Sequence, residues 1–74
     1  MFLVIEIQTN ADNTVGTLIT QHETMAQAEN KYYTVLAYAA VSELPMHAAM
    51  LCYNNGNLIM SKCFSHDGDE LNNG

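Results

Sequence analysis

The sequence predicts an α+β domain in which one helix packs on one face of a four-stranded antiparallel sheet. The dipeptide Asn55-Gly56 stands between two apolar runs, which is the strongest short signal for a β-hairpin. Two further runs, at residues 2–9 and 14–21, have the composition of strands, and apolar residues at 25–42 recur with the period of a helix. The resulting order ββαββ, joined by a right-handed crossover through the helix, gives the strand order 2-1-3-4.

The first two strands are predicted to form a hairpin. Residues 2–9 are rich in β-branched and aromatic side chains, and the polar cluster at 10–13 favours a turn because Asn and Asp tolerate left-handed backbone. The expected pairs are Thr9 with Thr14, Gln8 with Val15, Ile7 with Gly16, Ile5 with Leu18 and Val4 with Ile19. Both faces of this hairpin therefore carry apolar pairs.

Residues 25–42 are predicted to form the helix. Thr24 followed by Gln27 is a capping box, and nearby glutamates place negative charge at the helix N-terminus, where the helix dipole favours it. Pro45 ends the element, because the residue before a proline disfavours helical backbone. The side chains expected to face the sheet are Met25, Ala28, Tyr32, Val35, Leu36, Ala39 and Ala40. We interpret this stripe as core, since alanine and aliphatic side chains offer no ligand chemistry.

The second hairpin is predicted with a type I′ turn at Asn55-Gly56, since that turn needs positive φ at both central residues. The expected pairs are Tyr53 with Leu58, Cys52 with Ile59, Leu51 with Met60, Met50 with Ser61, Ala49 with Lys62, Ala48 with Cys63 and His47 with Phe64. Because side chains alternate along a strand, each face of this hairpin takes both residues of every second pair. Neither face is polar, which indicates assembly more than chemistry.

Length and composition describe a small domain with little charge. The chain has 74 residues, of which 49% are apolar and 14% charged, and a domain of this size buries only about 60% of its unfolded surface. The net charge is −6, and part of it lies in residues 67–74, which we predict to be a disordered acidic tail outside a single domain at 1–66. An exposed apolar surface is therefore the unusual property of the domain.

Composition also narrows the classes of partner. Lys31 and Lys62 are the only basic residues besides the histidines, and they cannot supply the patch that nucleic-acid binding requires. Glu6 interrupts the N-terminal apolar run, and the run at 32–41 is about half the length that a bilayer needs. We therefore expect neither a signal peptide nor a membrane anchor. The expected location is the cytoplasm, or a particle assembled there.

The reactive side chains do not assemble into a recognisable site. In the predicted register Cys52 and Cys63 are about 13 Å apart, so both are expected to be free thiols in a reducing compartment. His47 points to the opposite face from both cysteines, which argues against a Cys-His nucleophile, and His22 has no convergent carboxylate. The acidic residues at 67–70 lack the spacing of a calcium loop. No catalytic residue, cofactor or metal site is predicted.

A partner surface is predicted on the face of the sheet away from the helix. The helix is expected to cover Leu3, Ile5, Ile7 and Leu18. The uncovered apolar residues are then Phe2, Val4, Val15 and Ile19, beside one face of the second hairpin. A monomer rarely exposes so large an apolar patch, so we expect a homodimer with its sheets packed face to face. Two tyrosines outside the core stripe are further candidate contacts, Tyr33 and Tyr38.

Four stretches of the chain resemble a group of short uncharacterised proteins encoded in phage and prophage regions of Gram-positive bacteria. These stretches are FLVIEIQTN at 2–10, TVGTLIT at 14–20, AENKYYTVLAYAAVS at 28–42 and PMHAAML at 45–51. The resemblance implies a setting, in a bacterial host cell or in a virion. It implies no activity.

Two functions follow as expectations. The first is a non-enzymatic phage or prophage accessory protein that associates with itself and with a virion or host protein. The alternative is an inhibitor of a host defence system or host enzyme, which would use an acidic surface against a basic target. Salt separates the two, because an apolar contact persists at high salt whereas a charged contact weakens as the Debye length shrinks.

Overall fold

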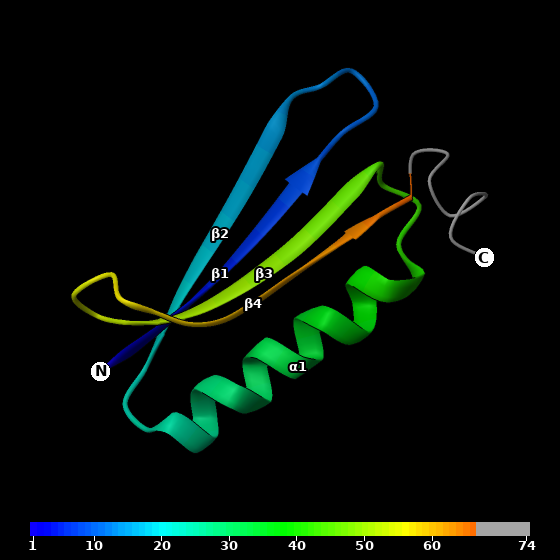
Figure 1. Ribbon diagram of the computed structural model, residues 1–74. Helices are drawn as coiled ribbons and strands as arrows, with labels where there is room; N and C mark the ends of the chain where they lie inside the picture. Colours follow the sequence, from blue (N-terminus) through cyan, green and yellow to red (C-terminus); the bar gives the residue numbers. More distant parts are fainter. Residues whose placement is uncertain (67–74) are drawn as a thin grey trace.

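The computed structural model describes residues 1–66 (Figure 1). Along the chain, one β-hairpin precedes a single helix and a second β-hairpin follows it. The elements are β1 (Phe2–Thr9), β2 (Val15–His22), α1 (Met25–Val41), β3 (Met46–Tyr53) and β4 (Leu58–Ser65). The strands form one antiparallel sheet in the order β2-β1-β3-β4, and α1 crosses one of its faces. The predicted fold class and strand order are confirmed. The tail predicted at 67–74 lies outside the described residues.

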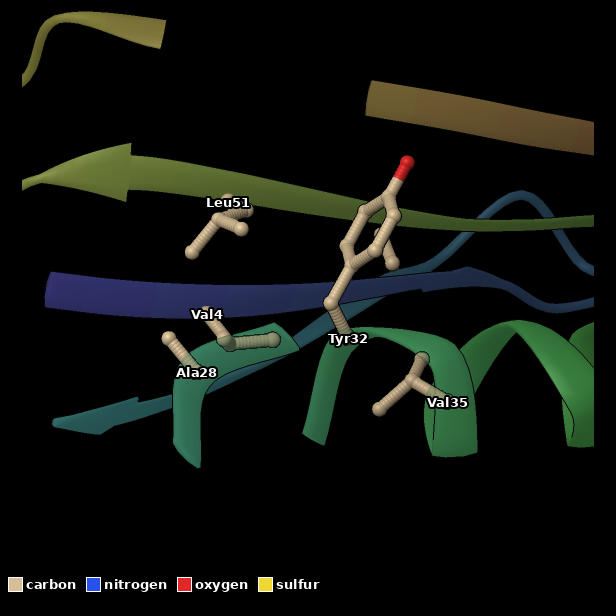
Figure 2. Packing of buried hydrophobic residues seen from close by; sticks show 6 residues of the cluster. Val4, Ala28, Tyr32, Val35 and Leu51 are labelled. Carbon is tan, nitrogen blue, oxygen red and sulfur yellow. The ribbon is translucent and has the colours of Figure 1, made fainter. Parts of the chain in front are cut away.

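The core lies between α1 and the two central strands, β1 and β3. Figure 2 shows Val4 and Leu51 of the sheet beside the helical residues Ala28, Tyr32 and Val35. Val4 and Leu51 are the largest fully buried side chains, and full burial of such a side chain stabilises a fold by about 1.5–3 kcal/mol. Alanines from both layers are also buried at this contact, which lets the helix approach the sheet closely.

Helix α1 begins at the predicted cap and ends with two bonds to one carbonyl. The Thr24 side chain accepts a hydrogen bond from the Gln27 backbone N–H at 3.1 Å. At the other end the Ser42 N–H and the His66 Nε2 both lie within hydrogen-bond distance of the Ala39 carbonyl, at 3.3 and 2.9 Å. The buried helical residues, Ala28, Tyr32, Val35 and Ala39, all belong to the predicted core stripe. Ala40, which was also predicted there, is exposed.

The register of the β1–β2 hairpin differs by one residue from the prediction. The observed pairs include Thr9 with Val15, Ile5 with Ile19, Glu6 with Leu18 and Val4 with Thr20. The Asn10 N–H donates to the Thr14 carbonyl at 2.8 Å, and Asn13 takes a left-handed backbone with φ of 73°. The loop thus absorbs one more residue than predicted. Because side chains alternate, this shift exchanges the two faces of β2 relative to β1.

The β3–β4 turn is a three-residue loop, and the predicted type I′ turn is wrong. Within this turn only Gly56 has positive φ, at 93°. The Gly56 N–H donates to the Tyr53 carbonyl, and the Tyr53 N–H donates to the Asn57 carbonyl, both at 2.9 Å. These bonds describe a type I turn followed by a left-handed glycine, the usual geometry of a three-residue hairpin loop.

A bulge at Ile59 restores the predicted register in the rest of this hairpin. Cys52 pairs with Leu58, where the sequence predicted Ile59, and the register then shifts between Cys52 and Leu51. From Leu51 with Met60 onward the pairs are those predicted. A bulge sets two residues of one strand against one of its partner, so Ile59 and Met60 both pack against the core.

Gly56 is expected to be the glycine on which this turn depends. Gly56→Ala should lower the free energy of unfolding by about 1–2 kcal/mol, because an L-residue is strained at positive φ. Gly16→Ala is the matched control, since Gly16 has no left-handed backbone and a Cβ there would meet open space. That control should be neutral or stabilise by about 0.5 kcal/mol. Urea unfolding measures both, and equal losses would contradict the assigned turn.

Candidate interaction surface

Helix α1 covers the opposite face of β1 from the one predicted. Val4 is 1% exposed, and Phe2 packs partly buried at the border of the same core. The prediction that these two residues lie on the uncovered face is therefore wrong. The residues predicted beneath the helix, Leu3, Ile5 and Ile7, occupy the uncovered face instead, since they alternate with Val4 along β1.

Leu18 is a separate exception. It shares the helix side of the sheet, because it pairs with Glu6, but it remains 55% exposed. The helix makes most of its contacts with β1 and β3 and reaches β2 less. The prediction that the helix covers Leu18 is therefore wrong as well, and the β1–β2 turn lies away from the helix (Figure 1).

A polar cluster lies on the helix side of the sheet. The Nε2 of His47 lies 2.6 Å from one carboxylate oxygen of Glu6, and Gln8 Nε2 donates to the same oxygen at 2.8 Å. His47 is 5% exposed. A buried carboxylate without partners would be strongly destabilising, whereas these bonds satisfy it on the covered side. Leu3, Ile5 and Ile7 lie on the other face.

Sequence reasoning missed the pair between Glu6 and His47. Strand alternation alone favoured placing the apolar residues of β1 under the helix and its polar residues in water. The available signal was the predicted strand order, which sets β1 beside β3. A glutamate and a histidine on neighbouring strands can then share one face and satisfy each other there.

The surroundings of Glu6 favour its ionised form. Burial raises the pKa of Glu6, but hydrogen bonds from Gln8 and His47 and the charges of His47 and Lys31 together hold it below its ordinary value of 4.5. Beside the carboxylate lies a shallow cleft of about 150 Å³, lined by Glu6, Gln8, Gly16, Thr17 and Leu18. Residues 1–66 gather no group of three or more potential metal ligands. The contact between Glu6 and His47 joins β1 to β3 on the side of the sheet beneath the helix.

We use the term open face for the side of the sheet opposite α1, which no element of residues 1–66 covers (Figure 1). Its apolar positions are Leu3, Ile5 and Ile7 on β1, Val15 and Ile19 on β2, Met46, Ala48, Met50 and Cys52 on β3, and Leu58 and Cys63 on β4. Its remaining positions are Thr9, Thr17, Gln21, Ser61 and Ser65. None of these side chains carries a charge. The open face is thus apolar across all four strands.

The predicted contact residues fall on different sides of the molecule. Val15 and Ile19 lie on the open face, with 60% and 57% of their surface exposed. Tyr33 and Tyr38 of α1 are also exposed, and the Tyr33 hydroxyl donates to the sulfur of Met60 on β4 at 3.8 Å. The structure therefore does not bring the predicted residues together as one surface.

Both cysteines are free, and both lie on the open-face side of the sheet. Cys52 is buried between its neighbours, whereas Cys63 on the edge strand is exposed. His47 lies on the opposite side of β3, as alternation predicted. Cys63 can consequently report on whether the open face is covered.

Comparisons of the chain with protein-family models, with curated proteins and with solved structures find no match. Within the described residues no helix combines the length and the apolar content needed to cross a bilayer. The exposed acidic residues of the described part of the chain lie apart from one another. Asp12 is in the β1–β2 turn, Glu23 precedes α1 and Glu43 follows it. The open face is a feature that all four strands share.

Proposed function

We propose that this protein acts by association through its open face, first with a second copy of itself. The observation that carries the proposal is an apolar, uncharged sheet face that spans all four strands. The water-facing side of an antiparallel sheet is normally polar. Packing the open face against another surface removes its apolar side chains from water, which is the main favourable term in protein association.

A second copy is the partner that suits this surface. In a two-fold dimer each patch meets its own equivalent, so an acidic or basic patch would oppose itself. The open face contains no charged side chain and meets no such repulsion. A charged partner, in contrast, would lose solvation against an apolar surface without gaining a counter-charge.

The dimensions of the sheet allow a modest interface. Four strands about 4.8 Å apart, with eight residues at about 3.3 Å each, give a face of about 500 Å² per copy. Two such faces bury about 1,000 Å² in total, at the lower end of specific interfaces. We therefore expect a dimer that forms at micromolar concentrations, with its sheets stacked and its helices outside.

In this dimer α1 remains on the outside, and Tyr33 and Tyr38 of this helix remain exposed. Exposed tyrosines are frequent anchors in protein contacts. The resemblance to phage and prophage proteins suggests the setting, which is the host cytoplasm or the virion, and the role proposed there is a non-enzymatic, accessory one. A virion or host protein that docks on the helices would complete that role.

The test compares the mass in solution of the wild-type protein with the masses of two variants. Each variant adds one charge, and the two charges lie on different sides of the molecule. Met50→Lys places a charge at the centre of the open face, and a lysine chain is long enough to reach water from there. Tyr38→Lys adds the same charge on the outer helix as the matched control. By light scattering at tens of micromolar, wild type and Tyr38→Lys should form species of at least two chains, and Met50→Lys should halve that mass.

Two further measurements distinguish this proposal from the alternative function. Association should persist at high salt, and the exposed Cys63 should react more slowly with a thiol reagent as the protein concentration rises. A wild-type species of one 8.2 kDa chain at these concentrations would overturn the proposal. Association that disappears with salt would instead favour a charged contact, as expected of an acidic inhibitor.

A further inference from the structure

We infer that the free edge of β2 is a second self-association site, which pairs with β2 of another copy and extends the sheet. β2 pairs with β1 on one side, and no strand of residues 1–66 lies on its other side. The site uses backbone groups and the helix side of the sheet. It is therefore independent of association through the open face.

The backbone of β2 offers hydrogen-bonding groups outward at every second residue. The Asn10 N–H donates to the Thr14 carbonyl, so by alternation the even-numbered residues of β2 bond to β1. The bond from Asn54 N–H to the Met1 carbonyl agrees, because it directs the odd-numbered residues of β1 toward β3. The N–H and C=O groups that point outward from β2 then belong to Val15, Thr17, Ile19 and Gln21.

The two edge strands of the sheet, β2 and β4, differ in how well they are protected against pairing with a strand of another molecule. Natural edge strands avoid pairing by means of charges, prolines or bulges. β4 has such devices, since it carries Lys62 and the bulge at Ile59. β2 contains no Asp, Glu, Lys, Arg or Pro, and its eight residues pair with β1 in one continuous register. Most of its residues are exposed. β2 is therefore the edge that is open to another strand.

A second copy fits this edge in a defined register. A two-fold axis perpendicular to the sheet sets a residue opposite its own equivalent and keeps both helices on the same side. If this axis passes between the Leu18 residues of the two copies, then Thr17 lies opposite Ile19 of the second copy. Gly16 then lies opposite its Thr20, and Val15 lies opposite its Gln21. The space beside Gly16, where a Cβ would meet nothing within 4 Å, leaves room for that threonine.

The central pair supplies the apolar contact. Leu18 lies on the helix side but is 55% exposed, because the helix leaves it uncovered. In the proposed register it occupies a position without hydrogen bonds to its opposite residue, where the Cα atoms of an antiparallel pair are about 4.5 Å apart. Leu18 would therefore bury its side chain against the Leu18 of the second copy.

A disulfide tests this register directly. In a Cys63→Ser background, Leu18→Cys sets two thiols opposite each other at a Cα separation that a disulfide tolerates. Thr20→Cys is the matched control on the same strand and face, and its Cα atoms would be about 13 Å apart in the two copies. Cys52 is buried and common to both variants. After mild oxidation, Leu18→Cys should run as a covalent dimer on a non-reducing gel, and Thr20→Cys should remain a single chain.

Charge pairing provides a second test that does not depend on oxidation. Leu18→Lys and Leu18→Glu should each prevent edge pairing, because like charges would stand opposite each other. An equimolar mixture should restore it, since each pair then joins opposite charges. Absence of the Leu18→Cys dimer, or equal cross-linking at positions 18 and 20, would overturn the inference. The cross-link should survive in a Met50→Lys background, so failure of open-face association leaves this result unaffected.

Discussion

Leu51→Ala is expected to remove a large part of the stability of the domain. Leu51 has no exposed surface and lies at the centre of the contact between α1 and the sheet. Truncation of such a side chain costs about 2–5 kcal/mol, through lost burial and the cavity that remains. A domain of this size has about 4–11 kcal/mol in total. Urea unfolding at submicromolar concentration should therefore show a strongly lowered midpoint, or a chain already unfolded without urea.

Leu58→Ala is the control for this result. It removes the same atoms from a leucine that is 54% exposed on the open face. Below the concentration of association it should cost less than about 1 kcal/mol, as surface substitutions usually do. Similar losses in the two variants would show that the helix does not cover the side of β3 on which Leu51 lies.

The pair between Glu6 and His47 is expected to produce the second large effect. His47→Leu leaves the part-buried Glu6 carboxylate with Gln8 as its remaining partner, and loss of a partner from such a polar group costs about 1–3 kcal/mol. The double variant Glu6→Leu with His47→Leu removes both polar groups. It should recover much of the loss, because replacement of a whole buried pair by apolar groups is often neutral or stabilising.

The same pair sets the response of the domain to acid. The pKa of Glu6 is lower in the folded protein than its ordinary value of 4.5, so the unfolded chain binds this proton more readily. The stability contributed by Glu6 is then fully present above about pH 4.5 and is lost as the pH falls through the lowered folded pKa. Urea unfolding between pH 3 and 7 should show this loss in wild type and a flatter profile in the double variant. Glu43→Gln, at an exposed site, should retain the wild-type profile.

The topology could be predicted because it depends on patterns that stay recognisable when the boundary of a strand or helix is misplaced by a residue. The alternation of apolar residues, the capping box at Thr24 and the proline at 45 each mark an element by its own chemistry. Right-handed crossover then leaves few ways to join them. Displacing any one boundary by a residue changes none of these conclusions, so the strand order agrees with the prediction.

The surface could be predicted only in part, since it depends on register. One additional residue in the loop before Val15 exchanges the faces of β2, and the helix meets the face of β1 that carries Glu6, where His47 is its partner. Val15 and Ile19 lie on the open face both in the prediction and in the structure. Phe2 and Val4 were predicted there but lie on the helix side. The alternation within one strand gives no information about a contact between polar side chains of two different strands.

The central position of β1 has a consequence for synthesis of the chain on the ribosome. β1 is made first, yet its pairs with β3 join Phe2 to Tyr53 and Thr9 to Met46. At about 5–20 residues per second, several seconds separate the emergence of these partners. During that interval the nascent β1–β2 hairpin presents two unpaired edges and apolar side chains on both faces. The chain is therefore exposed to misassembly until β3 has been synthesised, and a chaperone that acts on nascent chains would meet it in that state.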